Sequence, residues 1–233
     1  MCGRFTLRTP LTVLAQQFLF DLGDLPQDEW PPARDNICPT QDVAVVRQPG
    51  TGGRRELAWL HWGLIPSWSK DKKIAFSLIN ARCETVAEKP AFRTALARRR
   101  CLILADGFYE WKKEGKQKLP FLFHAKDERP LAFAGLWECW RGCNPSGKTF
   151  DESIPPLESC TIITTAANEL CQPVHERMPV ILDPADYDLW LDPSVTDRQR
   201  LLPLLTPYPA EQMSAVACTQ GVPHRSSPSA SLL

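Results

Sequence analysis

The sequence predicts a single α+β domain. Several short apolar stretches of strand-like composition alternate with Gly, Pro and Asp turn signals along most of the chain. Helix-like spacing of apolar residues is confined to a few short segments between them. The 233 residues suffice for a substantial core and show neither an internal repeat nor a clean linker. Many strands with peripheral helices favour one α+β domain.

The first part of the chain is expected to hold one helix and two strands. Thr9-Pro10 is typical of a helix start, an N-cap followed by proline at the first helical position. This helix is expected to run to about Phe20, and the acidic, Pro-rich segment 21–39 is expected to form an ordered loop. Strands are expected at 42–47 and 56–62, on either side of a Gly-rich turn.

The middle of the chain is expected to supply most of the sheet. A helical stretch around 90–100 precedes a buried strand at 101–105, and Asp106-Gly107 is a turn signal. Residues 108–113 and 118–124 are expected to pair as a hairpin. Strands at 130–138 and 159–165 continue the sheet.

The last part of the chain is expected to be mainly helical. A short helix is expected at 167–171, and 174–182 reads as a strand or an extended loop. Asp183-Pro184 begins a helix that ends at Leu191, and a second helix is expected within 196–205. The Ser/Pro-rich residues 223–233 are expected to form a flexible tail, which leaves 2–222 as the domain.

Charge and cysteine content narrow the class of protein. Lys plus Arg and Asp plus Glu number 27 each, which argues against nucleic-acid binding by bulk charge but allows a local basic groove. The 9 cysteines are an odd, scattered set, and no signal peptide is visible, so reduced thiols in the cytosol are expected. No apolar run approaches the ~20 residues of a membrane span.

Cys2 offers the most distinctive chemistry. Removal of Met1 would place a free α-amine beside its thiol. The pKa of an ordinary α-amine is about 7.7–8 and that of a thiol about 8.5, so both groups are partly nucleophilic near neutrality. Such a pair can form an imine with an aldehyde and then close a thiazolidine ring, whereas the thiolate alone can perform acyl transfer. Its position alone leaves open that the second residue is cysteine by chance.

Four motifs stand out: Cys2-Gly3-Arg4-Phe5, Asn80-Ala81-Arg82-Cys83-Glu84-Thr85, Ala105-Asp106-Gly107-Phe108-Tyr109-Glu110-Trp111 and Val174-His175-Glu176-Arg177-Met178-Pro179. Taken singly, Asn80 could cap a helix, Glu110 could be a solvated strand carboxylate and His175 a structural histidine. Together and in this order the motifs resemble the SOS response-associated peptidase (SRAP) family, whose members attach covalently to abasic sites in single-stranded DNA. The resemblance extends from Cys2 to about Leu191.

The resemblance implies a fold, a reaction and a set of catalytic residues. The implied fold is a β-barrel-like mixed-sheet core ringed by helices, with a DNA groove across one face. Cys2 would form a thiazolidine with the ring-opened sugar aldehyde, Glu110 and His175 would exchange protons with it, and Asn80 would hold the sugar. The family also implies removal of Met1, by an aminopeptidase or by the protein itself, and strand cleavage as a lyase side activity.

The resemblance assigns DNA contacts to Arg4, Pro39, Trp68, Arg82, Thr164 and Arg177. The arginines would bind phosphates, which suits the planar guanidinium. The tryptophan and the proline would stack on or wedge between bases, and the threonine would contact the DNA backbone. The chain departs from some members in having Trp68-Ser69 instead of two tryptophans and Pro90 where others carry a basic contact.

The expected partner is single-stranded DNA containing abasic sites, bound by a monomer. Cys139 and Cys143 suggest a zinc site, but no second pair and no nearby histidine complete four ligands. No metal and no other cofactor is therefore predicted.

Three alternatives remain at this point. Glutamine amidotransferases of the N-terminal-nucleophile type also open with Met-Cys-Gly, but they resemble one another further in a His-Arg-Gly and an Asn-Gly motif, and this chain has neither. A second alternative is the peptidase that the family name implies. The third is a non-catalytic nucleic-acid-binding module, for which Cys2→Ala would leave activity intact.

Overall fold

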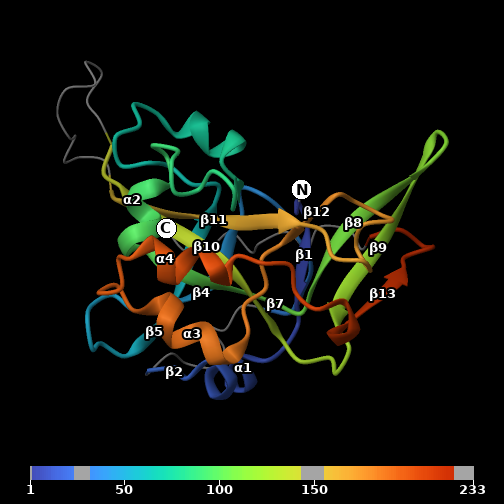
Figure 1. The fold of residues 1–233 in the computed structure, drawn as a ribbon, viewed down its shortest axis with the longest axis horizontal. Coiled ribbons are helices and arrows are strands. Elements are labelled where there is room, and N and C mark those ends of the chain that lie inside the picture. Colours follow the sequence, from blue (N-terminus) through green and yellow to red (C-terminus); the bar gives the residue numbers. More distant parts are fainter. Residues whose placement is uncertain (1, 24–31, 143–154, 223–233) are drawn as a thin grey trace.

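A closed barrel of five strands forms the centre of the computed structural model, which describes residues 2–23, 32–142 and 155–222 (Figure 1). The barrel strands are β4 (Asp42–Arg47), β5 (Arg55–Trp62), β7 (Arg100–Ala105), β10 (Leu131–Trp140) and β11 (Leu157–Ala166). Neighbours in the order β5-β4-β7-β10-β11 pair antiparallel. An odd number of strands cannot close by antiparallel pairing alone, and here the parallel pairing of β11 with β5 closes the ring.

The barrel interior is filled by apolar side chains in close contact. Every residue of β7 is buried, as expected for a strand covered on both faces. The Phe5 ring packs 5.1 Å from Trp62 and 5.9 Å from Phe133, measured between centroids. A Cβ at Gly135 would lie 2.8 Å from the Cys101 sulfur and 2.9 Å from Ile103 side-chain atoms, so neighbouring side chains fill the space beside this glycine.

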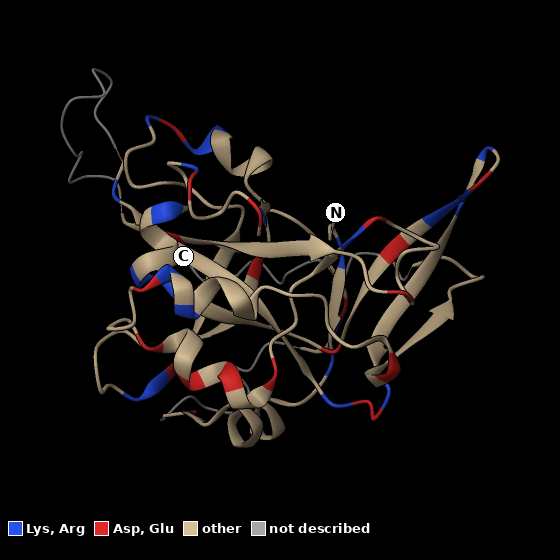
Figure 2. Cartoon of the chain, in the orientation of Figure 1, with Lys and Arg blue, Asp and Glu red and all other residues tan. Residues whose placement is uncertain are grey.

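A second sheet has the strand order β13-β9-β8-β1-β3. Its strands are β1 (Phe5–Leu7), β3 (Arg34–Ile37), β8 (Gly107–Glu114), β9 (Gln117–Ala125) and β13 (Met213–Ala217). The β8–β9 hairpin projects well beyond the rest of the molecule (Figure 1). Lys, Arg, Asp and Glu are interspersed along the chain, including the tip of this hairpin (Figure 2).

Three short strands and several short helices complete the fold. The strands are β2 (Phe20–Asp21), β6 (Asn80–Arg82) and β12 (Arg177–Pro179). The α-helices are α1 (Leu11–Phe18), α2 (Arg93–Arg98), α3 (Tyr187–Leu191) and α4 (Arg198–Leu201). The 3-10 helices are η2 (Lys72–Ser77), η3 (Pro184–Asp186), η4 (Leu202–Leu204) and η5 (Ala210–Gln212). The predicted α+β domain with a barrel-like core and peripheral helices is confirmed.

Some predicted elements are wrong in detail. The Thr9 hydroxyl does not cap α1; it donates to the Asp106 carboxylate at 2.7 Å, and the helix begins at Leu11. The Pro-rich segment contains strand β3. The helix expected at 167–171 is a series of turns, because the Asn168 side chain accepts the Cys171 N–H at 2.9 Å and donates to the Tyr208 carbonyl at 2.7 Å. The predicted tail lies outside the described residues.

Within the described ranges, none of the helices combines the length and the apolar character that crossing a membrane would require.

Candidate active site

Cys2 is positioned by strand β1. This strand pairs antiparallel with β8, and the Tyr109 N–H donates to the Arg4 carbonyl at 2.9 Å. Continuing the register toward the N-terminus places Cys2 beside Glu110 and Trp111. Cys2 is fully buried. Burial raises the pKa of its thiol, the Glu110 carboxylate raises it further, and a hydrogen bond from the Arg4 backbone opposes both effects.

Asn80 fixes the backbone of Cys2. The Asn80 Nδ2 group donates to the Cys2 carbonyl at 2.8 Å. Strand β6 brings it there by pairing parallel with β11, with Asn80 opposite Ile162. Asn80 Oδ1 is buried and has no hydrogen-bond partner among the described residues, so one acceptor remains for a ligand.

Glu110 lies on β8 and is only 4% exposed. Burial raises the pKa of its carboxyl, and the charged form of His175 acts in the opposite sense. A carboxyl of raised pKa is suited to giving and taking protons near neutral pH. The electrostatic coupling of Glu110 to Cys2 and to His175 joins these residues in one site.

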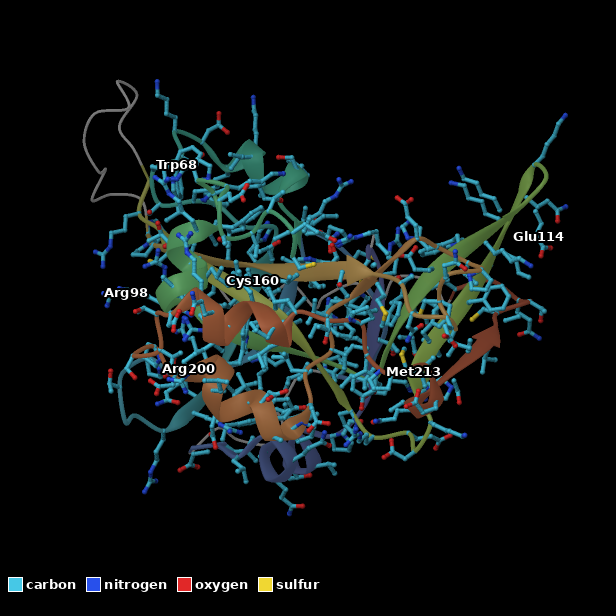
Figure 3. All side chains as sticks on the ribbon, in the orientation of Figure 1. Trp68, Arg98, Glu114, Cys160, Arg200 and Met213 are labelled. Carbon is cyan, nitrogen blue, oxygen red and sulfur yellow. The ribbon has the colours of Figure 1, made fainter. Side chains whose placement is uncertain are left out.

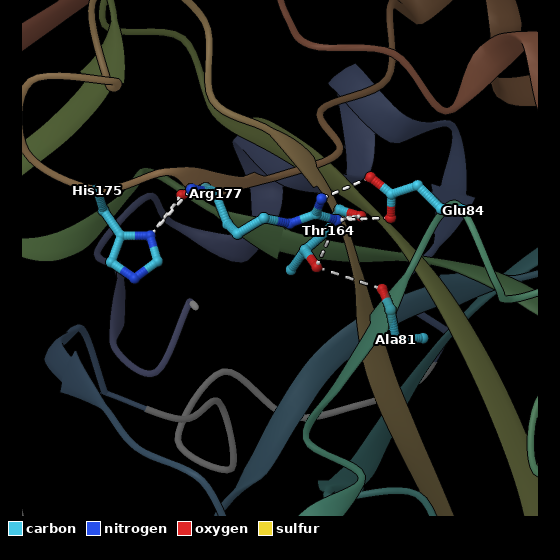
Figure 4. A network of polar contacts seen from close by, with 5 residues as sticks. All are labelled: Ala81, Glu84, Thr164, His175 and Arg177. Carbon is cyan, nitrogen blue, oxygen red and sulfur yellow. Dashed lines mark hydrogen bonds and ion pairs between the residues drawn. The ribbon is translucent and has the colours of Figure 1, made fainter.

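His175 precedes β12 and has a fixed orientation. Its Nδ1 lies 3.0 Å from the Arg177 backbone nitrogen and 3.2 Å from the Arg177 carbonyl. The contact with the backbone N–H has Nδ1 as acceptor and the ring proton on Nε2, whereas the contact with the carbonyl has Nδ1–H as donor. In Figure 4 the second ring nitrogen of His175 points away from Arg177.

Arg177 and Thr164 form a polar network next to His175 (Figure 4). The guanidinium makes two hydrogen bonds to the Glu84 carboxylate, at 2.5 and 3.0 Å, and one to the Thr164 carbonyl at 2.6 Å. These bonds to Arg177 lower the pKa of Glu84 to about 2. Thr164 is fully buried, and its hydroxyl donates to the Ala81 carbonyl at 3.4 Å. Contact of Thr164 with DNA stays a prediction that this buried position does not itself support.

The other predicted phosphate ligands differ in exposure. Arg82 is exposed at the end of β6. Arg4 is half-buried, and its Nη1 donates to Asn36 Oδ1 at 3.1 Å. Both arginines are close in sequence to residues of the site, at Cys2 and Asn80.

Trp68 is 56% exposed on the loop between β5 and η2 (Figure 3). Two residues of strand β10 form hydrogen bonds with this loop. The indole Nε1 of Trp140 donates to the Ser69 carbonyl at 2.7 Å, and the Ser67 hydroxyl donates to Glu138 at 3.5 Å. Pro39 is half-buried on a separate loop. Within the described residues no hydrogen bond joins Trp68 to Cys2, Asn80, Glu110 or His175.

Two residues near the site were missed by the sequence analysis. Glu84 lies in a quoted motif but was given no role, because its pairing with Arg177 spans 93 positions. Cys171 is buried, and burial together with the charge of Glu110 raises its pKa to about 12. Nothing in the spacing of the cysteines marks this residue.

Across residues 2–23, 32–142 and 155–222, no group of three or more His, Cys, Asp or Glu could hold a metal ion. Cys139 is half-buried, and Cys143 lies outside the described residues. The arrangement as a whole brings a thiol, a buried carboxyl, an imidazole and a carboxamide together, which suits nucleophilic and proton-transfer chemistry.

Comparisons with known proteins agree with this geometry. A family model described as "SOS response associated peptidase (SRAP)" matches residues 1–224. The chain is 45% identical over 216 residues to Abasic site processing protein YoqW of Bacillus subtilis (strain 168), covering 92% of this chain and 91% of that one. It is 31% identical over 203 residues to Abasic site processing protein YedK of Escherichia coli (strain K12), covering 85% and 83%.

The fold is also similar to solved structures. A crystal structure of a protein from Bacteroides thetaiotaomicron matches with a TM-score of 0.78 and 26% identity, covering 93% of this chain and 91% of the other. The motifs, the barrel and the family model agree over nearly the whole length, and the chain therefore belongs to the SOS response-associated peptidase family.

Proposed function

We propose that this protein captures abasic sites in single-stranded DNA as a covalent Cys2 adduct. The observation that carries the proposal is the hydrogen bond from Asn80 to the Cys2 carbonyl, at 2.8 Å, beside the coupled pair Glu110 and His175. These groups surround the residue that becomes the N-terminus after removal of Met1. The names of the relatives, abasic site processing proteins, supply the substrate class.

The amine of Cys2 makes the first bond. Its lone pair attacks the C1′ aldehyde of the ring-opened sugar to give a carbinolamine. Loss of water, with a proton delivered from Glu110 to the departing hydroxyl, leaves an imine. This order suits the raised pKa of the thiol, because the thiol is neutral while the amine reacts.

The thiol closes the ring in the second step. As the C–S bond forms at C1′, the π electrons of the imine move to nitrogen. The proton leaves sulfur for the Glu110 carboxylate and is returned to nitrogen, so the net reaction of aldehyde and aminothiol yields a thiazolidine and one water. In reverse, the same proton transfers release the sugar.

Asn80 and His175 hold the sugar during these steps. The buried Oδ1 of Asn80 accepts a hydrogen bond from a sugar hydroxyl, and the Nε2–H of His175 donates to a sugar oxygen. Arg4, Arg82 and Arg177 bind phosphates, and Trp68 and Pro39 contact the neighbouring bases. The imine also acidifies the C2′ proton, so β-elimination and strand cleavage occur when ring closure is prevented.

Intact-protein mass spectrometry, before and after mixing with abasic single-stranded DNA, tests the proposal. The mature chain is expected to lack Met1 and to gain the mass of the DNA minus one water. Cys2→Ala is expected to lose the heat-stable adduct, because its amine can form only an imine. Cys2→Ser separates thiol chemistry from the loss of volume.

Two outcomes would contradict the proposal. One is a stable crosslink formed by Cys2→Ala, and the other is full crosslinking by a chain that keeps Met1. Glutamine hydrolysis measured on the same preparation tests the amidotransferase alternative, and cleavage of a peptide that carries residues before cysteine tests the peptidase alternative.

A further inference from the structure

The Asn36 side chain contacts two segments for which DNA contacts are proposed. Asn36 lies on β3 and is only 4% exposed. Its Oδ1 accepts a hydrogen bond from Arg4 Nη1 at 3.1 Å and another from the Cys38 thiol at 3.5 Å. Arg4 is two residues beyond Cys2, and Cys38 comes directly before Pro39. One buried oxygen therefore contacts both the proposed phosphate ligand and the segment that presents the proposed base contact.

Strand pairing brings these groups together. β1 pairs antiparallel with β3, with Phe5 opposite Ile37. Continuing this register by one residue places Arg4 opposite Cys38, and facing side chains on neighbouring strands lie within contact distance. The hydrogen bond between Arg4 and Asn36 thus follows from the sheet, although 32 positions separate the two residues.

Pro39 lies in a turn closed by the Gln41 N–H, which donates to the Cys38 carbonyl at 3.3 Å. The next residue, Thr40, has a φ of 72°, a left-handed conformation that β-branched residues rarely adopt. Such a conformation persists only where the surrounding contacts hold it. Here Gln41 Oε1 accepts the Cys38 N–H, and the Thr40 N–H donates to a backbone carbonyl of β5, both at 2.9 Å. The position of Pro39 therefore depends on how Cys38 is held.

A carboxamide suits this place better than a carboxylate would. The Asn36 oxygen orients Arg4 without cancelling its positive charge, which stays available to a DNA phosphate. A guanidinium has five N–H donors, so one bond to Asn36 is compatible with a two-bond phosphate contact. A carboxylate in the same position would compete with the phosphate for the same donors.

We propose that Asn36 is a positioning residue, which holds the Arg4 guanidinium and the Pro39 turn in a fixed relation so that they bind DNA together. An arrangement made before DNA arrives reduces the ordering cost of forming the two contacts. Each contact is then stronger when the other is present. The DNA-binding roles of Arg4 and Pro39 rest on the proposed function, whereas the hydrogen bonds of Asn36 do not.

A double-mutant cycle tests whether Arg4 and Pro39 act together. Fluorescence anisotropy gives the affinity of wild type, Arg4→Met, Pro39→Ala and the double variant for single-stranded DNA that carries a tetrahydrofuran analogue of the abasic site. The double variant is expected to bind at least about threefold more tightly than the product of the two single losses predicts. In an Asn36→Ala background this difference is expected to disappear. Multiplicative losses in the wild-type background, or undiminished coupling in Asn36→Ala, would overturn the proposal.

Asn36→Asp separates orientation from charge, because it keeps the shape of the side chain. Its carboxylate is expected to pair with Arg4, so the slope of log affinity against log salt is expected to become shallower by about 0.7, the contribution of one phosphate contact. Asn36→Ala leaves the charge of Arg4 available, so the slope is expected to stay while affinity falls about three- to tenfold. An unchanged slope in Asn36→Asp would show that Asn36 does not act on a phosphate ligand, and the proposal would fail.

Gln17→Ala is the matched control. Gln17 is a half-buried carboxamide on α1, at the far side of the molecule from the N-terminus in Figure 1, and its Nε2 donates to the Pro130 carbonyl at 2.8 Å. Its loss is expected to change neither affinity, slope nor coupling. Thermal unfolding checks that each variant is folded at the temperature of the binding measurement. If Asn36→Ala is unfolded there, the slope in Asn36→Asp decides.

The two proposals fail in different ways. If the wild-type protein forms no adduct but binds the analogue, the proposed function fails, and the cycle still decides the role of Asn36. If the adduct forms but Arg4 and Pro39 are not coupled, only the positioning role fails. If the wild-type protein does not bind the DNA at all, both proposals are overturned.

Discussion

The Cys2 thiol and the Glu110 carboxyl share one property: burial favours the uncharged form of each. A thiol held in its neutral form by burial cannot begin with thiolate attack. The α-amine has no such restriction, because it is nucleophilic when uncharged. At the scale of single residues, the environment therefore favours the amine as the first nucleophile.

Glu110→Gln tests whether the Glu110 carboxyl transfers protons during the reaction. The substitution removes the proton donor and acceptor, so crosslinking at saturating abasic DNA is expected to slow by about a hundredfold or more. The variant is also expected to be more stable than wild type near neutral pH. Because folding raises the pKa of Glu110, the protonated folded state is favoured at low pH, and this advantage is lost as pH rises through the folded pKa.

Urea unfolding at acidic and at neutral pH measures the difference in stability between Glu110→Gln and wild type. Glu114→Gln is the control. Glu114 lies on the same strand, but its side chain is 51% exposed, so its substitution is expected to change neither stability nor rate. A Glu110→Gln variant that is less stable than wild type at neutral pH would contradict the buried carboxyl.

The sequence identified the reactive residues of the site but not all of the side chains that pair with them. The motifs identified Cys2, Asn80, Glu110 and His175, and the structure brings these four together. The partner of Arg177 was not accessible, because an ion pair between strand β12 and a turn 93 residues earlier leaves no local pattern. The sequence analysis therefore assigned Arg177 to a DNA phosphate and did not foresee its pairing with Glu84.

At the scale of elements, strand β10 supports the loop that presents Trp68. Trp140 donates its indole N–H to Ser69, and the Lys72 ammonium lies 5.5 Å from its ring centroid. The Ser69 hydroxyl in turn donates to the Asp71 carbonyl at 2.7 Å. These contacts turn Ser69 inward, where some family members have a second tryptophan, and leave Trp68 exposed.

Trp140→Phe keeps the ring and removes only the indole donor. Abasic-DNA affinity is expected to fall about five- to tenfold, since losing one buried hydrogen bond costs about 1–1.5 kcal/mol. The crosslinking rate at saturating DNA is expected to stay unchanged, because the site around Cys2 is not touched. Fluorescence anisotropy and single-turnover crosslinking separate the two quantities.

Trp59→Phe is the matched control, because Trp59 is 38% exposed on the outside of strand β5. It is expected to change neither affinity nor rate. A loss of rate with unchanged affinity in Trp140→Phe would show that this tryptophan supports the catalytic centre rather than the loop.

The strands that were predicted correctly have a clear sequence pattern. Strand β4 and the buried strand β7 were found nearly to the residue, because both are apolar runs bounded by turns. The short strands β6 and β12 were not resolved, because each gains its stability by pairing with β11 and not from its own composition. Strand β13 pairs only with β9 and has a weak apolar pattern, so it was missed.

At the scale of the whole molecule, the formal net charge is zero, and the charges are interspersed along the chain (Figure 2). Bulk attraction therefore contributes little, and DNA affinity depends on a few local contacts. With Arg4, Arg82 and Arg177 as the phosphate ligands, the slope of log affinity against log salt is expected to lie at about −2.

The affinity for DNA in the non-covalent complex, measured between 50 and 200 mM salt, gives this slope. An unreactive tetrahydrofuran analogue of the abasic site keeps the measurement at equilibrium. A slope steeper than about −4 would require many more phosphate contacts than the three arginines supply.

The closed barrel itself was expected only through the family resemblance, because strand patterns do not specify which strands meet to close a ring.

The parallel pairing that closes the barrel joins β11 to strands made much earlier in the chain. At roughly 5–20 residues per second, a ribosome needs roughly ten to thirty-five seconds to proceed from Cys2 to His175. Until then the nascent amino terminus has no barrel to fold against. Translation thus provides an interval in which Met1 can be trimmed from an accessible end before Cys2 is enclosed.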